Sequence, residues 1–198
     1  YCAGNPVNFV DPDGMRWINK NGQIVYNQDG LSPHASYEEI QLANEMNRTR
    51  TGRAQLQKLI GSGFDVTVII NGDTFPSEYG INRNFGIIHH KRTNSFIPYK
   101  GSEITIYKKK AATRSQYLST LEAMAVNFSH EIEHITSENC KLQFYKFSKE
   151  DIEYHPQEIA REIINEYYIM KPLNSIEKLQ ILINTIITSQ LSTNTTDL

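Results

Sequence analysis

The sequence predicts an α+β fold in which a small mixed sheet is followed by helices. Three observations lead to this fold class. Short β-branched runs bounded by turn residues lie before residue 110, long stretches of helical periodicity dominate after residue 115, and 198 residues suit one compact domain with a tail. The composition, 39% hydrophobic and 21% charged, is typical of a globular protein.

The first regular element expected is a β-hairpin within residues 15–33, which we interpret as a linker. Residues 16–20 and 23–26 flank Asn21 and Gly22. Both turn residues tolerate positive φ, as the two central positions of a type I′ turn require.

Two helices and a buried strand are expected next. Ser36 opens the first helix, with Glu38 and Glu39 in its first turn. A second helix over residues 53–60 ends at the Gly-Ser-Gly that follows it. Residues 64–70 are β-branched and apolar, which indicates a buried strand.

The rest of the chain turns from strands to helices. The elements expected are, in order, a polar loop over 71–84, strands over 85–90 and 103–108, helices over 115–136, 155–170 and 175–189, and a frayed tail over 191–198. Between strand and helix, Lys108, Lys109, Lys110 and Arg114 form a local basic patch, for which a solvated strand end is the simplest explanation.

Charge and cysteine content restrict the classes of partner. The net charge is −2 and the isoelectric point about 6.3, so nucleic acid is not a favoured partner. No apolar run approaches the length needed to span a bilayer. Cys2 and Cys140 do not make a disulfide framework. The chain begins at Tyr1 rather than at a methionine, and we expect it to be part of a longer protein.

A His-Glu-x-x-His motif carries the predicted chemistry. His130 and His134 lie four residues apart within an expected helix, so both imidazoles can reach one metal ion. Zinc accepts neutral imidazole nitrogen and imposes little geometric demand. Glu131 lies beside the pair, where its carboxylate can take a proton from a water activated by the metal.

This stretch resembles the zincin metallopeptidases, in which a helix supplies two histidine ligands and a glutamate base. The resemblance implies a zinc cofactor and a zincin-like fold for residues 34–190. Glu133 departs from the uncharged residue that the zincin pattern prefers there, and it is tolerated if it points to solvent.

A catalytic zinc needs a third protein ligand. The metzincin continuation is missing after His134, which leaves a glutamate on the following helix, as in the gluzincins. Glu158 is the first choice, because Glu158-x-x-Arg161 resembles the third-ligand segment of effector-type zincins. Glu162 is the alternative one turn further along, and His155 comes third. A salt-bridged helix face around Arg161 is the competing interpretation.

The first 14 residues resemble the end of the core of Rhs/YD-repeat proteins. The matching positions are Tyr1, Asn5-Pro6 and Asp11-Pro12-Asp13-Gly14. In that family a repeat shell encloses a variable C-terminal domain, which is typically a toxin paired with an immunity protein. The resemblance also implies self-cleavage near Met15 as a possibility for this chain.

Together these features predict four segments: an Rhs core end (1–14), a linker hairpin (15–33), a zincin-like toxin domain (34–190) and a disordered tail (191–198). The expected function is a zinc metallopeptidase, delivered into a target cell by its Rhs repeat shell, with a protein substrate and a cognate immunity protein as partners. Two alternatives stay open: a nuclease-type toxin tip, and a non-enzymatic binding module in which the two histidines are structural.

Overall fold

A computed structural model describes residues 16–72 and 77–171 and confirms the α+β fold class. The Rhs-like segment 1–14, the helix expected over 175–189 and the tail 191–198 lie outside these residues. Among the helices that the structure describes, none is long and apolar enough to cross a membrane.

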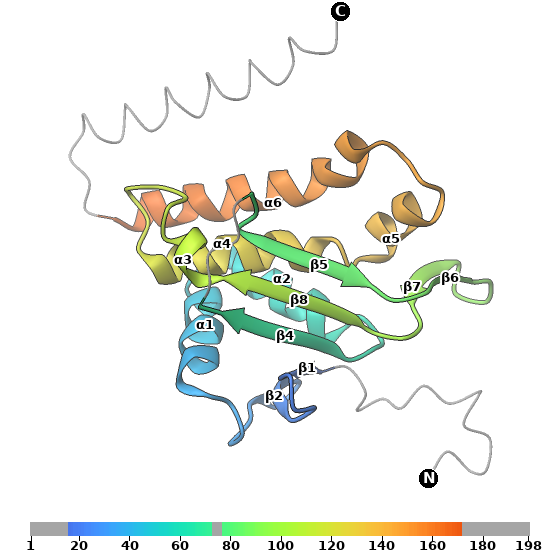
Figure 1. Ribbon diagram of the computed structural model, residues 1–198, viewed down its shortest axis with the longest axis horizontal. Helices are drawn as coiled ribbons and strands as arrows, with labels where there is room; N and C mark the ends of the chain where they lie inside the picture. Colours follow the sequence, from blue (N-terminus) through green and yellow to red (C-terminus); the bar gives the residue numbers. More distant parts are fainter. Residues whose placement is uncertain (1–15, 73–76, 172–198) are drawn as a thin grey trace, which may run out of the picture.

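A mixed six-stranded sheet forms one layer of the fold (Figure 1). In spatial order its strands are β3 (Gly30–Leu31), β2 (Ile24–Asn27), β1 (Trp17–Ile18), β4 (Val66–Asn71), β8 (Ser102–Tyr107) and β5 (Gly80–Asn84). β4 is parallel to both β1 and β8, whereas β5 is antiparallel to β8 at the edge of the sheet. The polar loop expected over 71–84 therefore contains an edge strand.

The helices form the second layer, and α1, α2 and α4 lie on one face of the sheet (Figure 1). The described helices are α1 (Tyr37–Arg48), α2 (Arg50–Ile60), α3 (Lys108–Ala111), α4 (Thr120–Glu133), α5 (Ser137–Phe144) and α6 (Lys149–Met170). α6 packs along α4 (Figure 1), and near its C-terminal end the hydroxyl of Tyr167 donates to the carbonyl of Glu45 on α1. Of these, α3 and α5 were not expected from the sequence.

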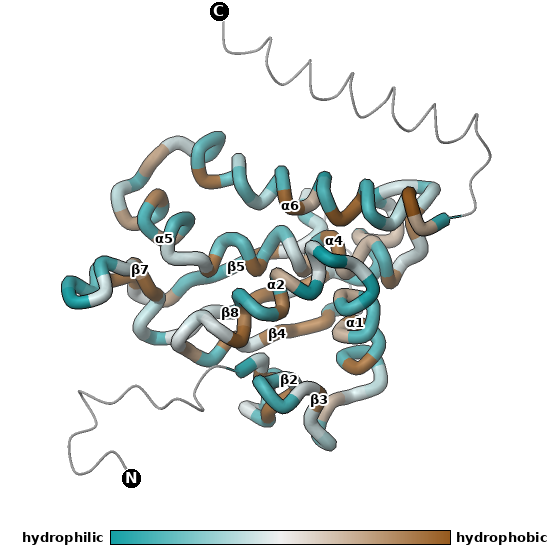
Figure 2. The backbone as a smooth tube through the Cα atoms, turned by 180° about the vertical axis from the view of Figure 1, so that it is seen from behind, coloured by the Kyte–Doolittle hydropathy of each residue, from teal (hydrophilic) through white to brown (hydrophobic). Residues whose placement is uncertain are grey.

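Strand periodicity explains why the sheet buries one face. Val66 and Val68 on β4, and Ile104 and Ile106 on β8, are at most 2% exposed, while their alternate neighbours are half-buried. In Figure 2, β4 is brown along its length, whereas α6 alternates between hydrophobic and hydrophilic residues. This is the pattern of an amphipathic helix that covers a core.

The N-terminal hairpin is present and belongs to the main sheet. Trp17 is fully buried and packs edge-on against Phe128 of α4, with ring centroids 5.0 Å apart. Gly22 has a φ of 75°, but Asn21 is not among the described non-glycine residues with positive φ, so the predicted type I′ turn is wrong. Residues 16–31 thus belong to the main sheet, so they are not a linker as the sequence had suggested.

A second, two-stranded sheet projects from one end of the molecule (Figure 1). It pairs β6 (Ile87–His90) with β7 (Ser95–Pro98) in antiparallel register. The strand expected over residues 85–90 therefore exists, but it lies outside the main sheet. The turn between these two strands, residues 91–94, contains the exposed Arg92.

Helix α6 begins six residues before its predicted start. Ser148 caps it by accepting a hydrogen bond from the backbone N–H of Asp151. Pro156, expected in the first turn, lies inside the helix and is buried. The extra N-terminal turns bring a residue to the histidine pair that the sequence did not single out.

Candidate metal centre

Helix α4 presents the His-Glu-x-x-His motif at its C-terminal end. A capping box opens the helix: Ser119 accepts from the backbone N–H of Glu122, and the Glu122 carboxylate accepts from the backbone N–H of Ser119. His134 is the C-cap and keeps helical dihedral angles. Both imidazoles therefore project from one side of the helix, as the four-residue spacing predicts.

Glu153 of α6 completes a group of three potential metal ligands with His130 and His134. Its carboxylate oxygens lie 3.1 Å from Nε2 of His130 and 3.5 Å from Nε2 of His134. The three donor atoms all lie within 4.8 Å of one another. Atoms bound about 2.1 Å from a tetrahedral zinc would be about 3.4 Å apart, so this donor set fits a zinc ion in both chemistry and spacing.

The residues predicted as third ligand lie elsewhere on α6. Glu158 is half-buried and has an oxygen 3.7 Å from Nδ1 of His155, which is exposed. Glu162 approaches the hydroxyl of Thr51 at 3.5 Å. Neither glutamate nor His155 belongs to the group around the histidine pair. Glu153 is the carboxylate of α6 that lies beside the histidine pair, and the sequence did not single it out because α6 starts earlier than predicted.

Charge pairing within this group changes its acid–base behaviour. Hydrogen bonding to His130, followed by that to His134, holds the pKa of the Glu153 carboxyl well below its usual range. Burial alone would lower the pKa of His134, but the hydrogen bond to Glu153 and the negative charge of Glu131 outweigh it, so the net pKa is raised. The group thus holds a carboxylate anion against two imidazoles.

Asn139 of α5 fixes the orientation of His134. Its Nδ2 donates to the carbonyl of Ile152 at 2.6 Å, so its Oδ1 faces the imidazole, 3.2 Å from Nδ1. A neutral His134 with its proton on Nδ1 would leave the Nε2 lone pair directed at Glu153 and the metal position. The Ile152 carbonyl is available because Pro156, four residues later, has no backbone N–H to donate.

Glu131 lies beside the three ligands and is 6% exposed. Burial raises the pKa of its carboxyl, while the charges of His130 and His134 act in the opposite direction. Its side chain rests against Gly80 of β5: a Cβ at that glycine would stand 2.9 Å from Oε1 and 3.0 Å from Cγ of Glu131. Strand β5 therefore limits how far the Glu131 carboxylate can move toward Gly80.

The sequence suggested that a charge at position 133 is tolerated if the side chain points to solvent. In the structure Glu133 is buried instead. It is 7% exposed and accepts hydrogen bonds from Nζ of Lys58 at 2.6 Å and from Nε2 of Gln55 at 3.0 Å. Both partners are on α2. The unusual charge in the motif is thus paired with Lys58 of α2 and is not part of the group formed by His130, His134 and Glu153.

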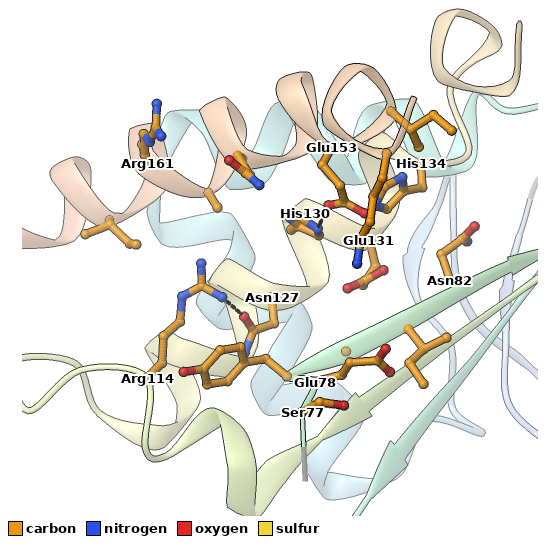
Figure 3. Close-up of a pocket in the computed structure, with 18 of the residues that line it drawn as sticks. Ser77, Glu78, Asn82, Arg114, Asn127, His130, Glu131, His134, Glu153 and Arg161 are labelled. Atoms are coloured by element: carbon orange, nitrogen blue, oxygen red, sulfur yellow. Dashed lines mark hydrogen bonds and ion pairs between the residues drawn. The ribbon is translucent and has the colours of Figure 1, made fainter. Parts of the chain in front are cut away.

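The metal group lies in a cleft of about 750 Å³ between α4, α6 and β5 (Figure 3). Gly80, Ile81 and Asn82 of β5 line one wall. Asn127, one turn before His130 on α4, also lines the cleft, and so does Arg114. Nη1 of Arg114 donates a hydrogen bond to Oδ1 of Asn127 (Figure 3). Arg114 is thus part of the cleft and not of the solvated strand end that the basic patch suggested.

Comparisons with known proteins add no relative. A scan against protein-family models finds no match, and searches of curated proteins and of solved structures find no significant similarity.

Proposed function

We propose that this chain is a zinc-dependent peptidase whose metal ligands are His130, His134 and Glu153. The observation that carries the proposal is the convergence of these three side chains beside the buried carboxylate of Glu131. Three protein ligands and one open coordination position are the arrangement of catalytic zinc sites, whereas structural sites usually have four protein ligands.

Each residue has a distinct role in the proposed reaction. A bound zinc ion would polarise the scissile carbonyl and lower the pKa of the attacking water toward neutrality. Glu131 accepts the proton of that water on a carboxylate oxygen and returns it to the leaving amine as the peptide bond breaks. Burial supports this role, because it raises the pKa of the Glu131 carboxyl and so favours holding a proton between the two steps.

The peptide would bind along β5. Within the described part of the chain, this strand pairs with β8 on one side and with no strand on the other, and it lines the cleft with Gly80, Ile81 and Asn82. An extended peptide that added to this edge would pass directly beside Glu131. The proximity of Gly80 to Glu131 supports a substrate path here, since a bulkier residue would fill the space.

The proposed biological setting is that of a delivered toxin. The segment from Tyr1 to Gly14 resembles the end of an Rhs core, which supports a role as the C-terminal effector of a secreted Rhs-type protein. In that setting a target-cell protein is the substrate and a separately encoded immunity protein is the partner.

Metal analysis and cleavage assays test the proposal together. We expect the purified protein to hold one zinc ion per chain, to lose it in His130→Ala and Glu153→Gln, and to keep it in Glu131→Gln. Glu158→Gln is the matched control, because it makes the same chemical change on the same helix outside the group around the histidine pair. Wild type should cleave a degenerate peptide library, and Glu131→Gln should not. Folded protein that binds no zinc, or zinc retained in Glu153→Gln, would overturn the ligand assignment.

A further inference from the structure

The cleft contains a cation that the metal chemistry does not use. Arg114 follows α3, and its guanidinium donates to Oδ1 of Asn127 and lies 5.2 Å from the ring centroid of Tyr79. Within residues 16–72 and 77–171, Arg114 forms no ion pair with a carboxylate. Burial is the main influence on this side chain and lowers the pKa of its guanidinium.

The guanidinium is held in place rather than free to swing out. Asn127 is 1% exposed, and its Oδ1 receives the hydrogen bond from Arg114, which fixes the amide orientation. Among the residues that the structure describes, Nδ2 of Asn127 has no hydrogen-bond partner. A buried amide with an unused donor, next to a half-buried cation without a carboxylate, is a costly arrangement for a purely structural role. Binding an anion in the cleft would offset that cost.

The position of this pair relative to the metal group defines what could bind. Asn127 lies four residues before Glu131 on α4, which corresponds to about 6 Å along the helix axis. One residue of an extended peptide spans about 3.3–3.6 Å, and a side chain adds a few ångströms of reach. A peptide whose scissile bond lies at Glu131 would therefore bring the neighbouring residue to Arg114 (Figure 3).

We propose that Arg114 binds a carboxylate of the substrate, carried by the residue next to the scissile bond. This inference rests on the proposed peptidase function. The planar guanidinium presents paired N–H donors that match a carboxylate. Two sources supply that group: an Asp or Glu side chain, which makes the enzyme an endopeptidase with acidic specificity, and the C-terminal carboxylate, which makes it a carboxypeptidase.

A binding experiment tests this without relying on turnover. The zinc-loaded Glu131→Gln protein is titrated with fluorescein-labelled degenerate heptapeptides, and fluorescence anisotropy gives the dissociation constants. The peptide pools differ only in Glu against Gln at one position, or in a free against an amidated C-terminus. We expect tenfold to hundredfold tighter binding for one of the carboxylate-bearing pools, as a charge-assisted hydrogen-bonded pair would give. A preference for the Glu pools indicates the side chain as the source, and a preference for the free C-terminus indicates the terminal carboxylate.

Variants then assign the preference to Arg114. Arg114→Gln should abolish it, whereas Arg92→Gln, the same charge change in the exposed β6–β7 turn, should leave it intact. Arg114→Lys keeps the charge but loses the paired donors, so it should reduce the preference severalfold even if Arg114→Gln fails to fold. Equal binding of all pools, a preference that survives both Arg114 variants, or tenfold tighter binding of a phosphoserine pool than of the Glu pool would overturn the proposal. Zinc content and cleavage are measured separately, so a failure of the peptidase assignment is recognised independently.

Discussion

Asn139 offers the sharpest test of how the structure prepares the metal group. Its side chain is 1% exposed and joins three elements: Oδ1 faces Nδ1 of His134, and Nδ2 donates to the Ile152 carbonyl beside Glu153. Asn139→Ala removes both interactions and the hydrogen bond that Oδ1 accepts from Nε2 of Gln143 at 2.8 Å. Partners of metal-bound histidines typically contribute a factor of about 10–100 to metal affinity, and we expect a loss of that size.

The same substitution should lower stability for a separate reason. It removes the hydrogen bond to the part-buried Ile152 carbonyl, and the loss of such a bond costs about 0.5–1.5 kcal/mol. Pro156→Ala can repair this defect, because residue 156 then carries an N–H in position to donate to that carbonyl, four residues earlier in α6. In the double variant we therefore expect about 1 kcal/mol of stability to return, while zinc affinity stays low.

Two measurements separate the effects. Urea unfolding of the metal-free proteins gives the free energies of unfolding, and competition with a chromophoric chelator gives the zinc dissociation constants. Wild-type zinc affinity in Asn139→Ala would refute the role assigned to the His134 contact. Recovery of zinc affinity in the double variant would show instead that Asn139 acts through α6 and Glu153.

Three further predictions follow from the described contacts. Gly80→Ala should lower kcat by about 10- to 100-fold with unchanged zinc content, because its Cβ would displace Glu131; steady-state kinetics and metal analysis check this. Burial would raise the pKa of the Glu122 carboxyl, but the 2.7 Å hydrogen bond from Lys171 and the cap at the start of α4 lower it overall. Its contribution to stability is thus present above about pH 4.3 and is lost as the pH falls below it, so Glu122→Gln should flatten the fall in unfolding free energy between about pH 6 and pH 3. Burial raises the pKa of the Cys140 thiol to about 12, so iodoacetamide should modify it only after unfolding in guanidinium, as mass spectrometry of a Cys2→Ser protein would reveal.

Much of the fold could be predicted because local patterns agree with the final packing. The β-branched run of β4 and the capping signals of α1 are of this kind, since a buried strand and a capped helix depend on adjacent residues. Two histidines four residues apart also define their own geometry on a helix. The α+β class and the histidine pair are therefore visible in the sequence.

The edge strand β5 and the candidate third ligand Glu153 could not be predicted from the sequence, because both depend on tertiary contacts. β5 reads Gly-Ile-Asn-Arg-Asn and has little strand propensity, so only pairing with β8 makes it a strand. Glu153, which lies beside the two histidines, was not singled out because Pro156 suggested a helix start, whereas Ser148 is the N-cap of α6. An interior proline was tolerated because Asn139, on another helix, satisfies the carbonyl that it leaves free.

The packing of Trp17 against Phe128 has a consequence for where this chain can be cut and still fold. The indole is fully buried against the helix that carries the two histidines, and removal of a buried aromatic side chain costs about 3–5 kcal/mol. Cleavage near Met15 would release a fragment that retains all six strands of the sheet. A fragment starting at residue 34 would lack three of those strands and would leave Phe128 uncovered. We therefore expect the smallest fragment that folds to begin at or before Arg16, so that proteolytic release and folding of the helix with the histidine pair share one boundary in the chain.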